Sequence, residues 1–432
     1  MKSALLACCT LLLPALGPDE SVATGRAQQD AQPKARPNVL LIISDDQHWS
    51  DFGFMGSEVV ATPHLDELAA EGLVFPRGYV AAPLCRPSLA TLASGLHPHQ
   101  HKITGNDPPK GTQRKEMLRH IDALETLPDL LVAAGYQAMQ TGKWWEGASG
   151  RGGFTQGMTH GDPNFGGRHG DRGLTIGRVR MSPAKDFIDA AEEAGDPWLL
   201  WYAPFLPHTP HNPPEELLAR YQQEGVPLPV AKYRAMCTWF DQTCGDLLGY
   251  LDAKGIREET LVVLVTDNGW IQRTEGNGYA PRSKRTAYEG GVRTPIVLHW
   301  PGVIRAEQRE VPVSSVDIPA TILAACGIEV PEAWPGHDLR LARSEGEHAR
   351  GPVFGAAYTH DVVDLDDPAR SLVTRFVVDG EWKLLAHEDS SEGTAGFELF
   401  HLTEDPAESR PVEEPERRAA LLALLDGWWR PQ

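Results

Sequence analysis

The sequence predicts an α/β fold with a large, mostly parallel sheet sandwiched by helices and a smaller C-terminal antiparallel-sheet subdomain. Three observations lead to this prediction. Continuously apolar strand patterns, typical of sheets buried on both faces, alternate with helix patterns up to residue 331. From residue 332 on, short strand patterns follow one another without helices between them. The chain has 432 residues, 41% of them hydrophobic, and is therefore long enough to bury two unequal cores.

The first residues have the composition of an export signal. Residues 1–17, MKSALLACCTLLLPALG, carry one lysine, an apolar stretch too short to span a bilayer, and small residues at Ala15 and Gly17, where a peptidase can cut. We therefore expect a signal peptide and an exported protein, periplasmic or secreted. A lipoprotein cut before Cys8 is the alternative, although the apolar run ahead of that cysteine is short. Residues 18–37 are predicted to be a disordered leader, and no later segment has the pattern of a transmembrane helix.

The large α/β domain is expected over residues 38–331 and the small α+β subdomain over residues 332–432. The first strand, NVLLIISDD at 38–46, is an apolar run that ends in two acids. Further strands are predicted at 136–144, 197–204, 260–269 and 294–302, and helices at 62–72, 126–135, 182–195, 230–254 and 316–327. In the subdomain, strands are predicted at 371–380, 381–387 and 397–402, and a closing helix at 416–429.

Charge and cysteine content exclude some classes of protein. The net charge of -19 argues against a nucleic-acid partner, because an acidic surface repels phosphate. Of the six cysteines, Cys8 and Cys9 are expected to leave with the signal peptide. Cys237 and Cys244 lie in one predicted helix at a spacing of about 10 Å along its axis, too far for a disulfide. Together with Cys326, they are predicted to be buried packing residues.

Polar residues follow two of the predicted strands directly. Asp45 and Asp46 come after the first strand, and Asp267 and Asn268 come after the strand that begins at residue 260. The carboxyl ends of parallel strands meet at one edge of a sheet, where ligands collect. Three carboxylates brought together there repel one another unless a hard cation such as calcium or magnesium lies among them. The alternative is that Asp-Asp caps a helix and Asp-Asn-Gly forms a turn.

Cys85 stands at the start of a predicted helix, CRPSLATLASG at 85–95, which Gly95 ends. A helix N-terminus presents free backbone N–H groups and the positive end of the helix dipole. These suit an anionic ligand or a deprotonated nucleophile. The alternative is a buried thiol without chemical function.

Seven motifs occur in order between residues 38 and 408. They are SDDQ at 44–47, CRPSLATLASG at 85–95, TGKW at 141–144, PHTPH at 207–211, TDNG at 266–269, KRTAYEGGVRTP at 284–295 and ELFHLTEDPAE at 398–408. With these motifs the chain resembles the type I, formylglycine-dependent sulfatase family of the alkaline phosphatase superfamily. The resemblance implies hydrolysis of sulfate esters, on a sulfated small molecule or polysaccharide and most readily on sulfated carbohydrate.

The resemblance also implies catalytic roles. Cys85 matches the cysteine that a formylglycine-generating maturation enzyme oxidises. The hydrated aldehyde supplies the hydroxyl that attacks sulfur, and its second hydroxyl allows sulfate to leave by collapse back to the aldehyde. Lys143 and Lys284 match positions that bind sulfate oxygens, and either His208 or Lys284 protonates the leaving alcohol.

The metal set is implied by the resemblance as well as by the strand ends. Asp45, Asp46, Asp267 and Asn268 match the calcium ligands of the family. Ca²⁺ is therefore the expected cofactor, with Mg²⁺ as the alternative. It neutralises the sulfate oxygens and holds the nucleophile in line.

Two positions depart from the family pattern. Leu89 stands where the family has an arginine that braces the formylglycine, which bears on whether Cys85 is converted. Trp145 stands where the family has a histidine that contacts the formylglycine hydroxyl. We hypothesise that the HPHQH segment at 97–101 supplies the missing base, through His99 or His101, because it follows the nucleophile helix directly. A histidine-rich surface loop is the alternative.

A glycine-rich insertion at 150–180 carries several arginines and little apolar periodicity. Beside the site, its Arg168 and Arg172 are candidates for reading a polyanionic sugar, with Trp144 and Trp145 stacking on the sugar rings. A solvated loop is the alternative. His360, in the YTHD segment of the subdomain, is a further candidate for the cleft.

Two other functions remain open at this point. A phosphate or phosphonate ester hydrolase can use the same scaffold, because metal and lysines stabilise phosphoryl and sulfuryl oxygens alike. A degenerate sulfatase that binds sulfated glycans without turnover is suggested by Leu89 and Trp145. Against this binder stands the retention of Lys143, His208 and Lys284 beside a full metal set.

Overall fold

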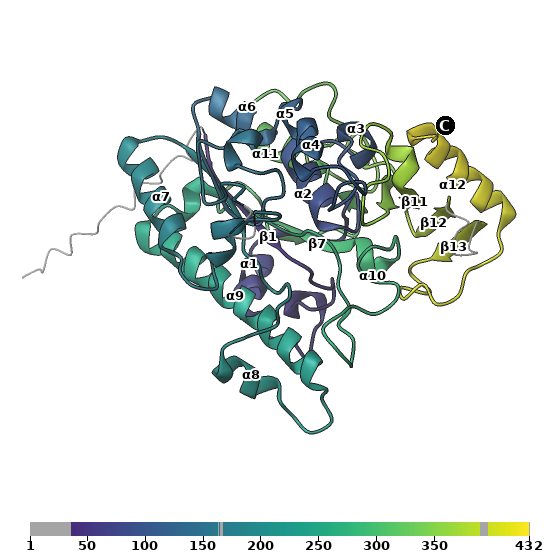
Figure 1. The fold of residues 1–432 in the computed structure, drawn as a ribbon, viewed down its shortest axis with the longest axis horizontal. Coiled ribbons are helices and arrows are strands. Elements are labelled where there is room, and N and C mark those ends of the chain that lie inside the picture. Colours follow the sequence, from purple (N-terminus) through teal and green to yellow (C-terminus); the bar gives the residue numbers. More distant parts are fainter. Residues whose placement is uncertain (1–35, 163, 165–166, 389–395, 432) are drawn as a thin grey trace, which may run out of the picture. The chain divides into compact units, whose positions relative to one another are not determined.

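A computed structural model describes residues 36–162, 164, 167–388 and 396–431 of the chain (Figure 1). The predicted signal peptide and nearly all of the predicted leader lie outside these residues. Within them, no helix combines the length and the apolar character needed to cross a membrane.

A nine-stranded sheet forms the centre of the larger part, in the order β4-β3-β5-β1-β6-β7-β2-β8, with β9 paired to β2. Its strands are β1 (Asn38–Ser44), β2 (Leu73–Tyr79), β3 (Gln137–Gly142), β4 (Gln156–Gly157), β5 (Trp198–Ala203), β6 (Thr260–Thr266), β7 (Arg293–His299), β8 (Glu307–Gln308) and β9 (Val313–Ser314). All pairings are parallel except those of β7 with β6 and β2. The prediction of a large, mostly parallel sheet is confirmed.

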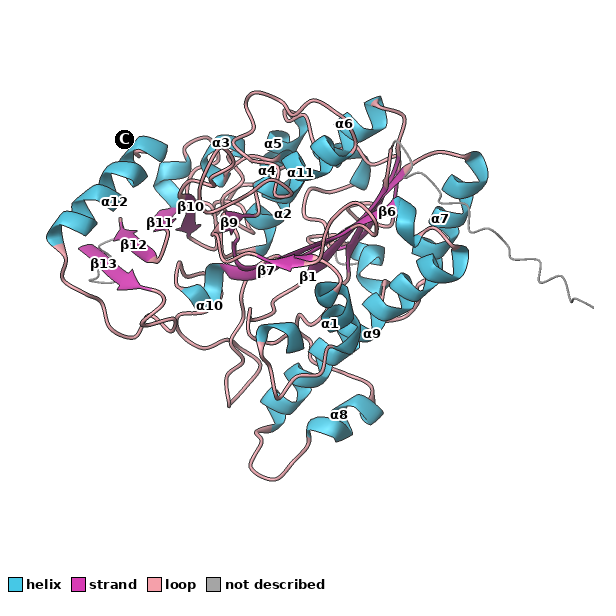
Figure 2. Cartoon of the chain, turned by 180° about the vertical axis from the view of Figure 1, so that it is seen from behind, coloured by secondary structure: helices cyan, strands magenta, loops and turns pink. Residues whose placement is uncertain are grey.

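Helices cover both faces of this sheet (Figures 1 and 2). On one face lie α2 (Cys85–Ser94), α3 (Pro98–His101), α4 (Arg114–Met117), α5 (Arg119–Asp122), α6 (Leu127–Ala133) and α11 (Asp317–Ala325). On the other lie α1 (Pro63–Ala70), α7 (Ser182–Ala194), α8 (Glu215–Tyr221) and α9 (Leu228–Lys254). In β1, Val39 and Leu41 pack into the first layer, whereas Leu40 and Ile42 pack into the second. Both faces are apolar, which explains the unbroken run of hydrophobic residues in this strand.

A separate antiparallel sheet of four strands follows, as predicted, in the order β10-β11-β12-β13. Its strands are β10 (Val353–Tyr358), β11 (Leu372–Asp379), β12 (Trp382–His387) and β13 (Gly396–His401), and α12 (Pro415–Trp428) packs on one face through Leu421 and Leu425. Five strands in the described part of the chain were not expected from the sequence: β2 and β10, and the two-residue strands β4, β8 and β9.

A buried charge cluster links the small sheet to the larger part. Lys383 of β12 lies 2.9 Å from a carboxylate oxygen of Glu289 and 2.9 Å from one of Glu408. Glu289 begins α10 (Glu289–Val292), in the KRTAYEGGVRTP motif, and Glu408 accepts its backbone N–H. All three side chains are buried, so the cluster fixes this motif against the small sheet.

Cys237, Cys244 and Cys326 are free and buried, as predicted. The first two lie on α9, and the third follows α11. They pack among apolar side chains of three different clusters.

Candidate active site

The carboxyl ends of β1 and β6 bring four polar residues together. The two strands are parallel neighbours in register along their full length, so the residues that follow them leave the sheet at one edge. The N–H of Asp46 donates to Asp267 Oδ1 over 3.0 Å, and Asn268 Nδ2 donates to Asp46 Oδ1 over 2.7 Å. Asp45 precedes them at the end of β1 and is also buried. The structure thus places the predicted metal-binding residues side by side.

Each of these side chains has one buried oxygen without a hydrogen-bond partner among the described residues. The atoms are Asp45 Oδ2, Asp46 Oδ2, Asp267 Oδ2 and Asn268 Oδ1. A buried polar atom left unbonded costs about 1–3 kcal/mol, so such a group of oxygens calls for a ligand. Carboxylate and amide oxygens are the ligands of Ca²⁺ and Mg²⁺. The donor set fits a hard divalent cation.

Two buried lysines face these carboxylates. Lys143 Nζ lies 2.5 Å from Asp45 Oδ1 and 3.5 Å from Asp267 Oδ2, and Lys284 Nζ lies 2.5 Å from Asp46 Oδ1. Burial by itself lowers the pKa of each ammonium, but the nearby carboxylates outweigh it and raise the pKa of both lysines. Both side chains are therefore cationic across neutral pH.

The TGKW motif aims Lys143 through a turn that requires glycine. β3 ends at Gly142, whose φ is +80°, and a Cβ there would lie 1.8 Å from the carbonyl oxygen of Ala203. The N–H of Lys143 donates to the same carbonyl over 2.7 Å. Only glycine permits this close approach of β3 to β5, which turns the lysine into the pocket.

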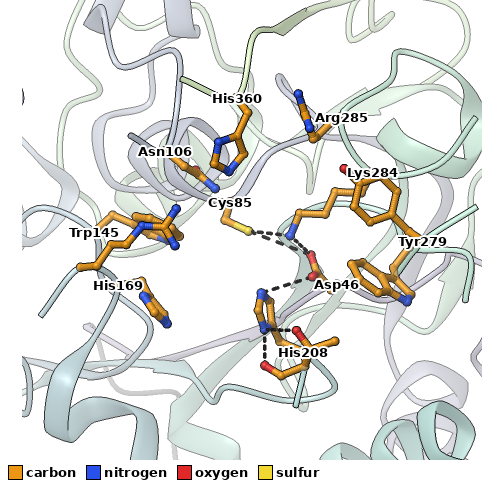
Figure 3. A pocket seen from close by; sticks show the side chains of 13 residues that line it. Asp46, Cys85, Asn106, Trp145, His169, His208, Tyr279, Lys284, Arg285 and His360 are labelled. Carbon is orange, nitrogen blue, oxygen red and sulfur yellow. Dashed lines mark hydrogen bonds and ion pairs between the residues drawn. The ribbon is translucent and has the colours of Figure 1, made fainter. Parts of the chain in front are cut away.

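Cys85 begins α2 and faces the same pocket (Figure 3). Its side chain is 1% exposed, and Lys284 Nζ donates to its Sγ over 3.0 Å. Burial raises the pKa of the Cys85 thiol to about 12, against the opposite effect of Lys143 and Lys284. The unmodified thiol is therefore protonated at neutral pH and is a weak nucleophile. The helix ends at Gly95, which has a φ of +66°, as predicted.

His208 lies on the other side of the carboxylates. Its Nε2 is 3.4 Å from Asp46 Oδ2, and its Nδ1 is 2.6 Å from the carbonyl oxygen of Thr209. Because a carbonyl oxygen only accepts, we assign the proton of the neutral ring to Nδ1 and the lone pair to Nε2. The ring stacks on Phe205, at 4.2 Å between centroids, which holds it in this orientation. One ligand atom each from Asp45, Asp46, Cys85 and His208 lie within 4.8 Å of one another.

These groups open onto a cavity of about 360 Å³ (Figure 3). Its lining residues include the predicted site residues Asp46, Cys85, Trp145, Arg168, His208 and Lys284, and the candidate His360. Six further lining residues were not predicted from the sequence: Asn106, His169, Thr209, Trp270, Tyr279 and Arg285. His360 follows β10, so the small sheet contributes to the wall. Thr209 and Arg285 lie inside the PHTPH and KRTAYEGGVRTP motifs, and Trp270 directly follows TDNG. The other three unpredicted residues lie outside the seven motifs.

Trp145 and Arg168 lie together at one wall of the cavity. The guanidinium groups of Arg114 and Arg168 lie 5.3 and 5.0 Å from the centroid of the Trp145 ring. Both arginines are also paired with Asp107. His169 packs against Trp145 at 5.3 Å between ring centroids. The indole is thus fixed by cations and by a second ring.

The other residues predicted to contact a sugar lie elsewhere. Trp144 is 1% exposed and packs edge-on against Phe154 and Trp201 in the core, so its ring is not available for stacking. Arg172 lies on the surface in a short 3-10 helix, η4 (Asp171–Thr175), and does not line the cavity.

The structure does not bring His99 or His101 to Cys85. The ring of His99 stacks on Trp429, at 4.7 Å between centroids, and contacts the edge of Trp428. His101 is buried behind α2, where its Nε2 lies 3.2 Å from Thr91 Oγ1. Because α3 turns the HPHQH segment away from the pocket, closeness in sequence to the nucleophile helix gave a misleading expectation.

Leu89 is buried in the apolar layer between the nine-stranded sheet and the helices on the side of α2. The arginine in this helix is instead Arg86, next to the candidate nucleophile, and its guanidinium makes two hydrogen bonds with Glu146, of 2.7 and 2.8 Å. The backbone N–H of Arg86 donates to Asn106 Oδ1 over 3.0 Å. These buried contacts tie the first turn of α2 to two loops of the cavity wall.

Comparison with protein families gives two matches. The family model described as Sulfatase matches residues 37–328. The model described as N-sulphoglucosamine sulphohydrolase, C-terminal, matches residues 279–427. The two matches overlap over residues 279–328, a range that includes the KRTAYEGGVRTP motif.

Individual proteins agree with these matches. The chain is 30% identical to the N-acetylgalactosamine-6-sulfatase of Sus scrofa over 366 residues, covering 74% of this chain and 68% of that protein. The crystal structure of Ps i-CgsB superimposes with a TM-score of 0.73 at 24% identity, covering 92% of this chain and 94% of that chain. The phosphonate monoester hydrolase of Agrobacterium radiobacter superimposes with a TM-score of 0.68 at 18% identity, covering 91% and 95%.

Proposed function

The chain belongs to the sulfatase family of the alkaline phosphatase superfamily and is a sulfuric ester hydrolase, and on that premise we propose that it removes sulfate from sulfated carbohydrates. One observation carries the proposal most directly. Cys85 Sγ, the position of the nucleophile, lies 3.0 Å from Lys284 Nζ beside a buried set of oxygen ligands at the bottom of an open cavity. An anionic ester that enters the cavity meets cationic groups on both sides of its reaction centre.

We propose that Cys85 is converted to formylglycine, which supplies the attacking hydroxyl. Asp45, Asp46, Asp267 and Asn268 are proposed to hold Ca²⁺, which would neutralise charge on the sulfate oxygens. Lys143 and Lys284 bind the same oxygens as fixed cations, and their carboxylate partners keep them in place before the substrate arrives. The low exposure of both lysines limits the water that competes with the substrate for them.

The proton for the leaving alcohol is assigned to Lys284. His208 carries its neutral-state proton on Nδ1, which faces the carbonyl of Thr209, so its Nε2 holds a proton only in the cationic ring. Lys284 holds protons across neutral pH and lies next to the nucleophile. His208 in its cationic form is the alternative donor.

Leaving-group dependence tests this assignment. A sugar alcohol needs a proton to leave, whereas nitrophenolate leaves without one. We expect Lys284→Gln to lower kcat for a sugar sulfate by about 10²–10⁴-fold more than kcat for 4-nitrophenyl sulfate. His208→Gln is the matched comparison, and we expect it to lower kcat for the two substrates by similar factors. The opposite ranking of the two variants would assign the proton to His208.

A phosphonate ester hydrolase is the second candidate, because a phosphonate monoester hydrolase shares this fold. Sulfate monoesters carry one negative charge and phosphate monoesters carry up to two. We expect kcat/KM for 4-nitrophenyl sulfate to exceed that for 4-nitrophenyl phosphate and for a phenylphosphonate ester by at least about tenfold, which equals a preference of about 1.4 kcal/mol. A higher kcat/KM for either phosphorus ester than for 4-nitrophenyl sulfate would favour the second candidate function over sulfate ester hydrolysis.

Export and maturation complete the proposal. We propose that residues 1–17 direct export to the periplasm or the medium, and that a formylglycine-generating enzyme is a transient partner. Residues 38–331 are proposed as the catalytic domain and residues 332–432 as a subdomain. The sequence patterns of these segments support this division.

A further inference from the structure

The cavity at Cys85 adjoins a second cavity. The second has a volume of about 420 Å³ and shares Tyr279, Lys284 and Arg285 with the first. Its other walls are the segment 286–288 and residues of β10, β11 and β12 and their ends, namely Ala357, Tyr358, Thr359, Val373, Thr374, Leu385 and His387. The space that begins at the nucleophile therefore continues between the segment at 279–288 and the small sheet.

Arg285 lies at the junction of the two cavities. Its neighbour Lys284 points down to Cys85, whereas Arg285 stands at the rim on the side of His360 (Figure 3). The backbone of Arg285 is left-handed, with a φ of +71°, and its N–H donates to the carbonyl oxygen of Pro83 over 2.8 Å. This hydrogen bond anchors the turn to the segment that precedes Cys85. One turn thus presents one cation to the reaction centre and another to the junction.

The guanidinium of Arg285 differs from the other cations of the cavity. Arg168 is paired with Asp107, and Lys284 with Asp46. In the part of the chain that the structure describes, the guanidinium of Arg285 makes no hydrogen bond and no ion pair, and the residue is exposed. Its left-handed backbone costs about 1 kcal/mol for a residue with a side chain, and such strain is concentrated at ligand sites.

The protein as a whole is acidic, with a net charge of -19, yet this guanidinium has no carboxylate partner among the described residues. A planar guanidinium binds sulfate or carboxylate through two parallel hydrogen bonds. Tyr279, which is common to both cavities, packs edge-on against Trp270 at 5.1 Å between ring centroids and offers an aromatic wall beside the arginine. An acidic sugar carries an anionic group, which can pair with the guanidinium, next to an apolar face of C–H groups, which can pack on the aromatic ring.

We propose that Arg285 binds a second anionic group of the substrate, a sulfate or a carboxylate carried by the sugar next to the one that bears the reacting ester. The proposal rests on the proposed function, because it extends the same site. The substrate class is then an acidic oligosaccharide, with the sugar that bears the reacting ester in the first cavity and its charged neighbour in the second.

Binding without turnover tests the proposal. We would measure Kd by calorimetry on the Cys85→Ala protein, with three disaccharides that carry the same sulfate ester. In the first the neighbouring sugar is neutral, in the second it carries a sulfate, and in the third it is a uronic acid. We expect one or both charged probes to bind about 10–100-fold more tightly than the neutral probe, the range of one charge-assisted hydrogen-bonded pair. Adding Arg285→Gln should remove that advantage.

Arg180→Gln is the matched control, because Arg180 is an exposed arginine outside both cavities. We expect it to preserve the advantage of the charged probes, and melting curves of both variants should match that of the parent protein. The probe that loses its advantage with Arg285→Gln identifies sulfate or carboxylate as the second group. Equal binding of all three probes to the parent protein, or an unchanged advantage in Arg285→Gln, would overturn the proposal. Failure of the proposed function shows separately, as an absence of sulfate release from every probe by the protein with an intact Cys85.

Discussion

Replacing Cys85 by alanine should lower kcat for sulfate ester hydrolysis by at least about 10⁴-fold, as expected for loss of a covalent nucleophile. The binding groups stay in place, because the side chain is small and Lys284 retains its pair with Asp46. The mass of the peptide that contains Cys85, taken from protein made with a maturation enzyme, should show an aldehyde in place of the thiol. That peptide also carries Leu89, so the same spectrum tells whether leucine is tolerated at the position of the family's arginine.

Cys326→Ala is the control for general effects of removing a buried thiol, since Cys326 is also buried but packs in the core after α11. We expect near-normal kcat in this variant. Full activity in protein whose Cys85 is unmodified throughout would contradict the assignment of formylglycine. Burial keeps the pKa of that thiol at about 12, which is why such activity is not expected.

Calcium should raise the melting temperature by a few degrees at about 100 times its Kd, which corresponds to about 2.7 kcal/mol of stabilisation. The reason is the buried group of oxygens at the strand ends, which a cation would satisfy. Asp267→Asn should abolish this shift and lower kcat/KM by about 10³-fold, the size of several kcal/mol of transition-state stabilisation. Scanning calorimetry with Ca²⁺ or Mg²⁺ added to chelator-treated protein measures the shift, and the larger shift identifies the metal.

Asp241→Asn provides the comparison for this experiment. Asp241 is a buried carboxylate of α9 that accepts the N–H of Leu65 over 2.8 Å, away from the strand ends. We expect calcium to raise the melting temperature of this variant as much as that of the parent protein, even if the variant itself is less stable. A calcium shift that persists in Asp267→Asn would show that the cation binds elsewhere.

The proximity of the proposed metal ligands could be predicted because it follows from the sheet. An apolar run that ends in acids defines a strand buried on both faces, and two such strands in parallel must end at one edge. We could therefore predict that Asp46 and Asp267 lie close together without knowing the structure of the loops between them. The same holds for Cys85 and Gly95, whose positions at the start and end of α2 follow from local helix rules.

The two longer strands that were not predicted, β2 and β10, depart from strand patterns for identifiable reasons. β2 contains Pro76, which has no N–H, and the register of its pairing with β7 shifts between Phe75 and Gly78. In β10, a Cβ at Gly355 would lie 2.4 Å from the ring of Phe376, so glycine is required where a strand pattern expects a β-branched residue. In both strands tertiary packing outweighs local propensity.

The side chains of the cavity wall depended on contacts between distant segments. His169 and His360 arrive from two loops, and neither has a neighbouring motif that fixes its direction. His99 shows the converse, because its position in the sequence favoured the pocket whereas aromatic contacts with α12 hold it elsewhere. Arg285 lies inside the KRTAYEGGVRTP motif, but the sequence does not reveal its left-handed backbone, which sets the direction of the turn.

The cluster of Lys383, Glu289 and Glu408 also sets an order of events during protein synthesis. Lys284 leaves the ribosome well before Lys383 and Glu408, which fix the motif that carries it. A nascent chain therefore cannot complete the wall of the pocket until its last strands have been translated. Cys85 is 1% exposed once folding is finished, so the proposed maturation enzyme would reach it on the growing or still unfolded polypeptide.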